Sequence, residues 1–590
     1  MREASHYRPE IDGLRALAVL AVVVFHFDRS WLGGGFVGVD VFFVISGFLV
    51  TSILLRDHKA GSFSLLRFYQ RRIARIFPAV LVMAIVTLGA SALWHTTWDL
   101  ANTSAAFSAS VLSIVNFHLA MQGDYFQMSE DAQPLLHCWS LAIEEQYYLL
   151  FPVLLWMVLK AGRRGGLLIL GLVASASFLA CILRTNQNPS AAFFFLPYRA
   201  WELLSGSLIA MAGLQLRTAS SQVNTGVFAA GMTILILSFF LLREDEGFPG
   251  WVAGWSVLGT ALVLVASETG VGRWLLSRPF AVGVGKRSYS LYLWHWPVFS
   301  FVDYVLPFEP PFVRFIVKLV LTSLATWLSY RLIERPCRKK LNLPTNRALA
   351  FGFLALTLLS LGPMGYALRK TFYIDGSDGT KGERIFPRDR ATGTLILMGD
   401  SHATALGPVI RNMAEERNWR LVVLSFAGGD PLPHSDGNSS PLWESNRAVI
   451  EREKPRHLVL ICDWHSKLEK DPGRLRLALG HLSPHVDHIT LLTVPPRRPE
   501  SASRSSIRKG SRAPFFESPG ELAKRQAVSR LLKKEAGVKV RLLDSSASFV
   551  RADQSVIVFD EGDHPLFHDH VHLSGRGVQR LRPRLEELLK

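Results

Sequence analysis

The most prominent pattern along the chain is a series of long apolar segments that ends near residue 367. A helix needs about 20 apolar residues to cross the roughly 30 Å hydrocarbon core of a bilayer. Eleven segments approach that length, at residues 11–27, 36–55, 77–94, 137–159, 167–184, 195–213, 224–242, 250–266, 287–305, 312–332 and 348–366. The pattern predicts a polytopic α-helical membrane bundle of about eleven transmembrane helices.

A different pattern follows residue 393, after a polar, glycine-containing stretch that we interpret as a linker. Short apolar runs at 394–398, 420–426, 457–462, 488–494 and 538–544 alternate with amphipathic segments at 402–417, 442–453, 473–482, 519–536 and 575–589. Such alternation predicts a soluble α/β domain with a parallel sheet. We therefore divide the chain into a transmembrane domain (1–340), an additional transmembrane helix with its linker (341–393) and an α/β domain (394–590).

Positive charge is distributed unevenly between the predicted loops. If the N-terminus is cytoplasmic, the cytoplasmic loops carry 18 Lys and Arg residues and the opposite loops carry three. The positive-inside rule favours this orientation. An odd number of spans then places the α/β domain on the far side of the membrane.

Composition changes this picture little. Much of the surplus behind the net charge of +17 lies in short loops between the apolar segments. The sequence contains no helix-turn-helix, zinc-finger or aromatic-basic module, so we expect no nucleic-acid partner. The four cysteines, three in or beside the apolar segments and one in the α/β domain, indicate no disulfide framework.

The first apolar segment carries Arg15 and His26, eleven residues apart. Eleven helical residues rise about 16 Å and complete about three turns, so both side chains lie on one face. Ionisable groups at membrane depth often mark a site or a pathway. The alternative is that Arg15 reaches the headgroups and His26 bonds a neighbouring helix. Their pairing on one face favours function.

Other apolar segments also contain ionisable residues. Glu144 and Glu145 are adjacent, and two neighbouring buried carboxylates are difficult to pair, which favours a functional role. Arg199 and Glu202 are three residues apart, and for them a structural ion pair is at least as plausible as catalysis. His295 stands between two tryptophans.

Three arginines, Arg71, Arg72 and Arg75, stand at the predicted cytoplasmic end of the third segment. The positive-inside bias explains part of this cluster. Guanidinium groups also match phosphate oxygens in geometry and charge. The cluster is therefore compatible with a phosphorylated cytoplasmic cofactor.

Several ordered motifs between residues 7 and 335 resemble the acyltransferase-3 membrane family, which includes O-acetylases of bacterial surface polysaccharides such as O-antigen. The motifs are YRPEIDGLRALAVLAVVVFHF, GGGFVGVDVFFVISGFLV, FYQRRIARIFP, HCWSLAIEEQYYLLFP and SLYLWHWP. The resemblance implies that His26, with Arg15, is catalytic and that Glu144 or Glu145 supports the site. It also implies that Arg71 and Arg72, beside Arg75, help to hold acetyl-coenzyme A.

The α/β domain has its own candidate chemistry. In LILMGDSHATAL, a strand ends at Gly399 and Asp400 and a helix opens at Ser401, where free backbone N–H groups could stabilise an oxyanion. The alternative is an ordinary capping turn. In HDHVHLS, Asp569 precedes His572 by three residues. A serine, a histidine and an aspartate complete an acyl-transfer set.

This arrangement resembles the SGNH (GDSL-like) hydrolase family. The resemblance implies a Ser401–Asp569–His572 triad, with Ser401 and Gly428 or Gly429 as oxyanion donors. One departure is that the family's Gly-x-Asn segment has no Asn counterpart in ICDWHS (461–466). A competing interpretation makes metal ligands of His564, His568, Asp569, His570 and His572. We rank it below the triad, because it leaves Gly-Asp-Ser unexplained, and expect no metal.

The resulting hypothesis is a bacterial inner-membrane O-acetyltransferase that moves acetyl from cytoplasmic acetyl-coenzyme A to a hydroxyl of a lipid-linked or surface polysaccharide. The periplasmic SGNH domain completes the transfer through an acetyl-Ser401 intermediate. Three alternatives stay open. In the first, the SGNH domain is a carbohydrate esterase. In the second, the acceptor is peptidoglycan or another exopolysaccharide. In the third, the membrane half is a transporter.

Overall fold

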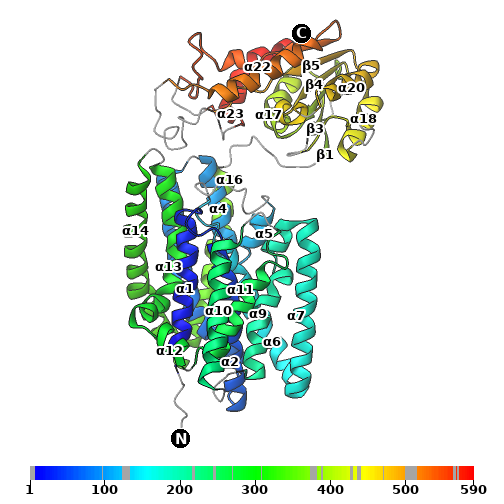
Figure 1. Ribbon diagram of the computed structural model, residues 1–590. Helices are drawn as coiled ribbons and strands as arrows, with labels where there is room; N and C mark the ends of the chain where they lie inside the picture. The colour runs from blue at the N-terminus through cyan, green and yellow to red at the C-terminus, as the bar shows by residue number, and fades with distance from the viewer. Residues whose placement is uncertain are drawn as a thin grey trace. The chain divides into compact units, whose positions relative to one another are not determined.

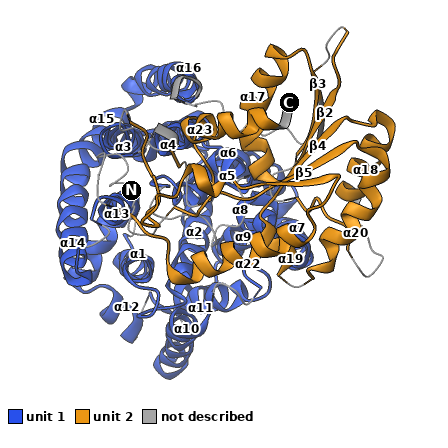
Figure 2. Cartoon of the chain, turned by 90° about the horizontal axis from the view of Figure 1, so that it is seen from above, with its two compact units in different colours: residues 1–372 blue, residues 373–590 orange. Residues whose placement is uncertain are grey.

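Helices α1 to α16 form the first of two compact units in the computed structural model, residues 1–372, and a six-stranded sheet with its helices forms the second, residues 373–590 (Figure 2). We call these the membrane unit and the α/β unit. The structure describes residues 7–95, 97–121, 133–214, 220–243, 247–268, 270–306, 309–372, 382–386, 390–425, 429–434, 440–469, 471–498, 514–561, 566–567 and 571–589.

All the regular secondary structure among the described residues of the membrane unit is helical (Figure 1). Its helices are α1 (Pro9–Phe27), α2 (Gly38–Lys59), α3 (Leu65–Trp94), α4 (Thr97–Val111), α5 (Val115–Ala120), α6 (Cys138–Leu159), α7 (Gly162–Gln187), α8 (Pro189–Phe194), α9 (Leu196–Ala212), α10 (Ser221–Leu241), α11 (Ala253–Ala266), α12 (Gly270–Leu276), α13 (Pro279–Val305), α14 (Pro311–Leu328), α15 (Arg335–Leu341) and α16 (Arg347–Phe372). A π-helical turn, Ser329–Glu334, joins α14 to α15.

Seven of these helical segments are long and apolar enough to cross a membrane, or eight if α11 and α12, bent by 106° from each other, form one span. The predicted count of eleven is not confirmed. Helices α1 and α9 are not among the seven. α1 carries Glu10, Asp12 and Arg15 near its start, and α9 has only 17 residues. Both bear polar side chains because they line the interior of the bundle.

Residues 95–136, which fall between the predicted spans 77–94 and 137–159, contain two helices that pack into the bundle. In α4, Ser108 donates a hydrogen bond to the Gly362 carbonyl of α16, and Asp99 accepts one from Tyr304 of α13 at 3.0 Å. A Cβ atom at Gly365 would lie 2.4 Å from the Ser104 carbonyl oxygen. Small side chains therefore let α4 and α16 approach closely, as in other helix pairs of membrane proteins.

Glycines bring α2 and α9 together in the same way. A Cβ at Gly47 would lie 1.8 Å from the Leu203 carbonyl oxygen, and one at Gly206 would lie 1.9 Å from that of Val44. This contact fixes α2, the helix that carries Asp40 and Ser46, against α9.

The α/β unit is built on one sheet with the strand order β1-β3-β2-β4-β5-β6. The strands are β1 (Gly382–Phe386), β2 (Thr394–Gly399), β3 (Arg420–Ser425), β4 (His457–Ile461), β5 (His488–Leu492) and β6 (Val540–Leu543). The helices are α17 (Ser401–Glu416), α18 (Pro441–Glu453), α19 (Trp464–Leu468), α20 (Gly473–Leu482), α22 (Pro519–Lys534) and α23 (Gly575–Leu585).

Strands β2 to β6 are parallel to one another, as predicted, but β1 runs antiparallel to β3. The sheet is therefore mixed, which corrects the expectation of a parallel sheet. β1 comes from the stretch that we interpreted as a linker. Its sequence, GERIF, holds only two apolar residues, too few to distinguish a strand by periodicity.

The strands alternate their side chains between two layers of helices. Leu395 and Leu397 of β2 pack with residues of α17 and α23, whereas Ile396 and Met398 pack with residues of α18 and α20. The chain leaves β2 through α17 to β3 on one side, and β4 lies on the other. The carboxyl end of β2 is thus a topological switch point, where α/β folds place their sites.

Candidate active sites

The Gly-Asp-Ser sequence occupies the switch point, and each residue has a distinct role. A Cβ at Gly399 would lie 1.7 Å from the Ile461 carbonyl oxygen, so β2 and β4 can meet there only at a glycine. The Asp400 carboxylate accepts hydrogen bonds from the backbone N–H of His402 at 3.0 Å and of Asp463 at 2.8 Å. It thereby caps α17 and joins it to the end of β4. Ser401 follows as the first residue of α17.

Ser401 and His572 meet although 171 positions separate them. The Ser401 Oγ atom lies 2.8 Å from His572 Nε2, within hydrogen-bonding distance. A hydroxyl in this contact can pass its proton to the imidazole as it attacks a carbonyl carbon. The backbone N–H of Ser401 lies in the first turn of α17, where N–H groups lack helical partners.

The remaining predicted members of this site are only partly covered by the structure. Asp569 and Gly428 lie outside the described residues, whereas Gly429 is described. Four of the five residues of the alternative metal set also lie outside them. Within the described part of the chain, no group of three His, Cys, Asp or Glu side chains is placed to hold a metal ion.

Two neighbours of the serine were not predicted. The ring of His402, a buried residue, lies 5.0 Å from that of His572. Its only signal in the sequence is its place after Ser401. Cys462 directly follows β4, near Asp400, and burial raises the pKa of its thiol, which favours the neutral thiol over the thiolate.

The position expected to hold an Asn is occupied by a different arrangement. Asp463 gives its backbone N–H to Asp400, and its carboxylate lies 3.6 Å from Arg497 Nη2. A cavity of about 450 Å³ adjoins Asp463 and is lined also by Thr493, Arg497 and Glu521. This part of the site is therefore built from charged side chains on the β4 and β5 loops and on α22.

The membrane unit contains a second candidate site, a cavity of about 780 Å³. We call it the arginine cavity. Arg15, Arg72, Arg75, Glu144 and Glu145 all line it, so residues from α1, α3 and α6 that were singled out separately in the sequence share one space.

The two adjacent arginines of α3 differ. The Arg72 guanidinium lies over the rings of Phe68 and Tyr148, 5.2 and 5.0 Å from their centres, and faces the arginine cavity. Arg71 instead pairs with Asp57 at 2.7 Å and is not among the residues that line the arginine cavity. The structure thus groups Arg72 and Arg75, but not Arg71, with Arg15.

The two adjacent glutamates also differ. Glu144 accepts hydrogen bonds from Ser46 at 2.7 Å and from Tyr148 at 3.3 Å. Glu145 Oε1 is buried and has no hydrogen-bond partner among the described residues. Only one of the two carboxylates is fully satisfied, as their adjacency suggested.

His26 lies outside the arginine cavity, in contact with a second histidine that also contacts a third. Its ring stacks on that of His295 at 5.5 Å, and the ring of His137 lies 5.7 Å from that of His295. We call these residues the three-histidine cluster. His137 was not singled out from the sequence, although it opens the motif that contains both glutamates.

A pair of hydroxyl groups separates this cluster from the arginine cavity. The Tyr292 hydroxyl and Ser140 Oγ are 2.7 Å apart, and both residues line the cavity. The Tyr292 ring also lies 5.6 Å from that of His137 and 5.3 Å from that of His295. The cavity that Arg15 lines and the cluster that contains His26 therefore adjoin each other at this hydroxyl pair.

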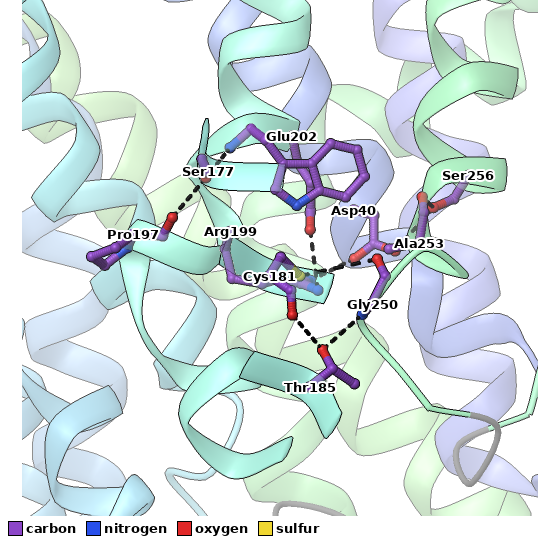
Figure 3. Close-up of polar contacts among 11 residues, drawn as sticks. Asp40, Ser177, Cys181, Thr185, Pro197, Arg199, Glu202, Gly250, Ala253 and Ser256 are labelled. Atoms are coloured by element: carbon purple, nitrogen blue, oxygen red, sulfur yellow. Dashed lines mark hydrogen bonds and ion pairs between the residues drawn. The ribbon is translucent and has the colours of Figure 1, made fainter. Parts of the chain in front are cut away.

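Arg199 and Glu202 form a separate buried network with Asp40 (Figure 3). Arg199 Nη2 lies 2.6 Å from Asp40 Oδ1, Arg199 Nη1 lies 3.1 Å from Glu202 Oε1, and Ser256 donates to Asp40 at 2.9 Å. The guanidinium is also surrounded by the rings of Phe43, Trp139, Phe193 and Phe248. None of the three charged groups lines the arginine cavity, which favours the structural interpretation of this pair.

A helical bundle with a charged internal cavity, followed by an α/β unit with a serine–histidine pair at its switch point, defines a multi-pass membrane protein with acyl-transfer chemistry. Residues 8–331 match the model of the acyltransferase domain family, and residues 372–587 match the SGNH domain that is fused to such domains. The chain belongs to this acyltransferase family.

Among curated proteins, the chain is similar to O-acetyltransferases of Staphylococcus aureus. A putative O-acetyltransferase of strain MSSA476 is 34% identical over 353 residues, and the O-acetyltransferase OatA of strain COL is 32% identical over 354 residues. Both matches cover 57% of this chain, and the chain spans 58% of the length of each relative.

Proposed function

We propose that the chain is a bacterial inner-membrane O-acetyltransferase that moves acetyl from cytoplasmic acetyl-coenzyme A to a hydroxyl of a cell-envelope glycan of the O-antigen or lipopolysaccharide type. In this proposal the N-terminus is cytoplasmic and the α/β unit is periplasmic. Family membership and the names of the relatives support O-acetyl transfer. The distribution of Lys and Arg between the loops supports the orientation.

The arginine cavity carries the proposal for the donor. Three guanidinium groups, those of Arg15, Arg72 and Arg75, line it, and coenzyme A presents several phosphate oxygens. The arginines would hold the phosphates, and the thioester would reach towards the hydroxyl pair and the three-histidine cluster. There His26 would accept the acetyl group or act as a general base.

The Ser401–His572 pair carries the proposal for the second transfer. As Ser401 Oγ attacks the acetyl carbonyl, His572 Nε2 takes its proton and returns it to the departing group. The acetyl-Ser401 ester is then attacked by a sugar hydroxyl, whose proton passes to the same imidazole and then to the released Ser401 oxygen. The net result is one ester on the glycan and a regenerated serine.

Mass spectrometry of envelope polysaccharide tests the two-site relay. Cells expressing wild type, His26→Ala or Ser401→Ala are compared at equal protein levels. Loss of the acetyl mass in both variants supports the relay. If only His26→Ala loses it, the membrane unit acetylates the sugar directly. If neither does, the proposed role of Arg15 and His26 is wrong. Separate analysis of peptidoglycan identifies the acceptor class.

The serine–histidine contact at 2.8 Å also supports a second candidate, a carbohydrate esterase in the α/β unit. Water would then replace the sugar hydroxyl in the second step. Purified full-length protein incubated with acetylated glycan distinguishes the two. Release of free acetate without any transfer to added sugar favours the esterase.

A further inference from the structure

The proposed reaction breaks one bond on each side of the membrane, and this creates a proton imbalance. On the cytoplasmic side the thioester C–S bond breaks and leaves a thiolate, which needs a proton to become the free thiol of coenzyme A. On the periplasmic side the acceptor O–H bond breaks as the ester C–O bond forms, and a proton is released. Unless the protein returns that proton, each acetyl transfer moves one positive charge outward.

Such charge movement would oppose the resting potential of a cell. Moving one elementary charge against 100 mV changes an equilibrium by roughly 50-fold. An inward path for protons would remove this penalty, because no net charge would then cross the membrane. The path must start at the group that gives up the acetyl and receives a proton in exchange, and it must end in the cavity where the thiolate forms.

The three-histidine cluster has the chemistry for the first part of such a path. His137 and His295 are 1% and 0% exposed. His26 Nδ1, His137 Nδ1 and His295 Nε2 are buried and have no hydrogen-bond partner among the residues that the structure describes. A neutral imidazole accepts a proton on one nitrogen and releases another from the second. Three adjacent imidazoles with free nitrogens therefore have the groups that a proton relay uses without acquiring a lasting charge.

The Tyr292–Ser140 hydroxyl pair connects this cluster to the arginine cavity. Either hydroxyl can donate across the 2.7 Å contact. Both also lie near the His137 carbonyl oxygen, at 3.2 Å from the Tyr292 hydroxyl and 3.3 Å from Ser140 Oγ. Each hydroxyl thus has two alternative acceptors, as a proton relay requires. Glu145, which lines the arginine cavity with the pair, offers a buried carboxylate oxygen that has no hydrogen-bond partner among the described residues.

We propose that the membrane unit returns one proton inward for each acetyl group that it passes outward, from the three-histidine cluster through the Tyr292–Ser140 pair to Glu145 in the arginine cavity. This inference rests on the proposed function. The Ser401 proton passes through His572 to the departing imidazole of the cluster, and the acceptor proton then restores the Ser401 hydroxyl. The relay shifts one proton along each step, and the thiolate gains one from Glu145. The overall transfer is electroneutral.

Inverted membrane vesicles from cells expressing the full chain test this proposal, because they enclose the native acceptor. Labelled acetyl-coenzyme A is added outside, and pyranine trapped inside reports the lumen pH, with valinomycin and potassium present to collapse the potential. We expect acetyl transfer with no protons released into the lumen. Release of one proton per acetyl group overturns the proposal. Absence of any transfer by wild type instead overturns the proposed function.

A double variant, Tyr292→Phe with Ser140→Ala, tests the route. We expect it to bind acetyl-coenzyme A, to transfer acetyl at least 10-fold more slowly, and to release about one proton into the lumen per residual transfer. Transfer at the wild-type rate without proton release excludes this route. If the variant does not fold, the number of protons released per acetyl group by the wild type still decides whether the overall transfer is electroneutral.

The matched control is Tyr147→Phe with Ser207→Ala. These two hydroxyls are also buried and 2.7 Å apart, but neither residue lines the arginine cavity. The control should leave both the rate and the proton ratio unchanged. Proton release by this variant would show that loss of any buried hydroxyl pair opens the membrane unit to protons, and it would overturn the assigned route.

Discussion

Two adjacent arginines, Arg71 and Arg72, face different surroundings. At the scale of single residues, this difference predicts that their substitution affects acetyl-coenzyme A binding unequally. Arg72 lines the arginine cavity, whereas Arg71 pairs with Asp57. A hydrogen bond to a charged group contributes about 1.5–3 kcal/mol. We expect Arg72→Ala to weaken acetyl-coenzyme A binding by at least about 10-fold, and Arg71→Ala by less than about 3-fold, in titrations of the purified protein. Equal losses would contradict the placement of the two side chains.

A second prediction concerns Gly399, which lies against the Ile461 carbonyl. Overpacking costs about 1–3 kcal/mol. We expect Gly399→Ala to lower the urea midpoint of the α/β unit, measured by pulse proteolysis of the full chain, and to displace Ser401. Gly480, inside α20 with nothing near its Cβ position, is the matched control, and there alanine should stabilise the unit by about 0.5–1 kcal/mol. An unchanged midpoint in Gly399→Ala would contradict the close approach of β2 and β4.

Site residues could be predicted from the sequence where residue type and spacing indicate the chemistry. Ser401 and His572 were predicted and are in contact, because the switch point of an α/β sheet gathers distant loops. The difference between Arg71 and Arg72 was not predictable. Neighbours on a helix point about 100° apart, and only the packing of α3 decides which one faces the arginine cavity. His402 was missed because it stands beside Ser401, and His137 because the glutamate pair of the same motif has the stronger signal.

At the scale of elements, the amino-terminal ends of β4 and β5 carry a pH-sensitive contact. The rings of His457 and His488 lie 5.1 Å apart. Burial, followed by the nearby His488 and the guanidiniums of Arg456 and Arg541, lowers the pKa of His457 to about 4. An unfolded histidine has a pKa of about 6.5. Between these values the unfolded chain binds more protons, so the stability of the α/β unit decreases as the pH falls from 6.5 to 4.

Thermal unfolding of the α/β unit measures this dependence. We expect a melting temperature lower by about 3 °C at pH 5 than at pH 7, and a smaller difference in His457→Gln. His481→Gln, which changes an exposed histidine on α20, should retain the wild-type difference. If His457→Gln and wild type show the same pH dependence, titration of another group is responsible.

Helices and strands were predicted correctly where their hydrophobicity differs clearly from that of the neighbouring segments. Strands β2 to β6 are short apolar runs between polar loops, and all were expected. Helix α4 was missed because it is rich in small and polar residues, such as Thr103, Ser104 and Ser108, that serve close packing rather than contact with lipid. Helices that cross a bundle's interior are less apolar than those at its surface, so counting apolar segments does not fix their number.

At the scale of the whole molecule, the relay makes a prediction about combined variants. If acetyl must pass through both His26 and Ser401, removing either site stops the same flux. We expect the double variant His26→Ala with Ser401→Ala to retain as much glycan acetylation as the more impaired of the two single variants. The effects of residues that act in one sequence of steps are strongly non-additive. Acetyl content per glycan repeat, measured by mass spectrometry at equal protein levels, checks this. Multiplicative losses would indicate two independent acetylation routes.

The short strand β1 determines how the α/β unit can be studied in isolation. It pairs with every residue of β3 from Leu421 to Ser425 and so covers one edge of the sheet. A fragment beginning at Thr394 would leave the N–H and C=O groups of β3 exposed, and uncovered edges promote strand exchange and aggregation. A soluble version of this unit should therefore begin before Gly382. Insolubility of a shorter fragment would reflect its missing edge strand rather than a requirement for the membrane.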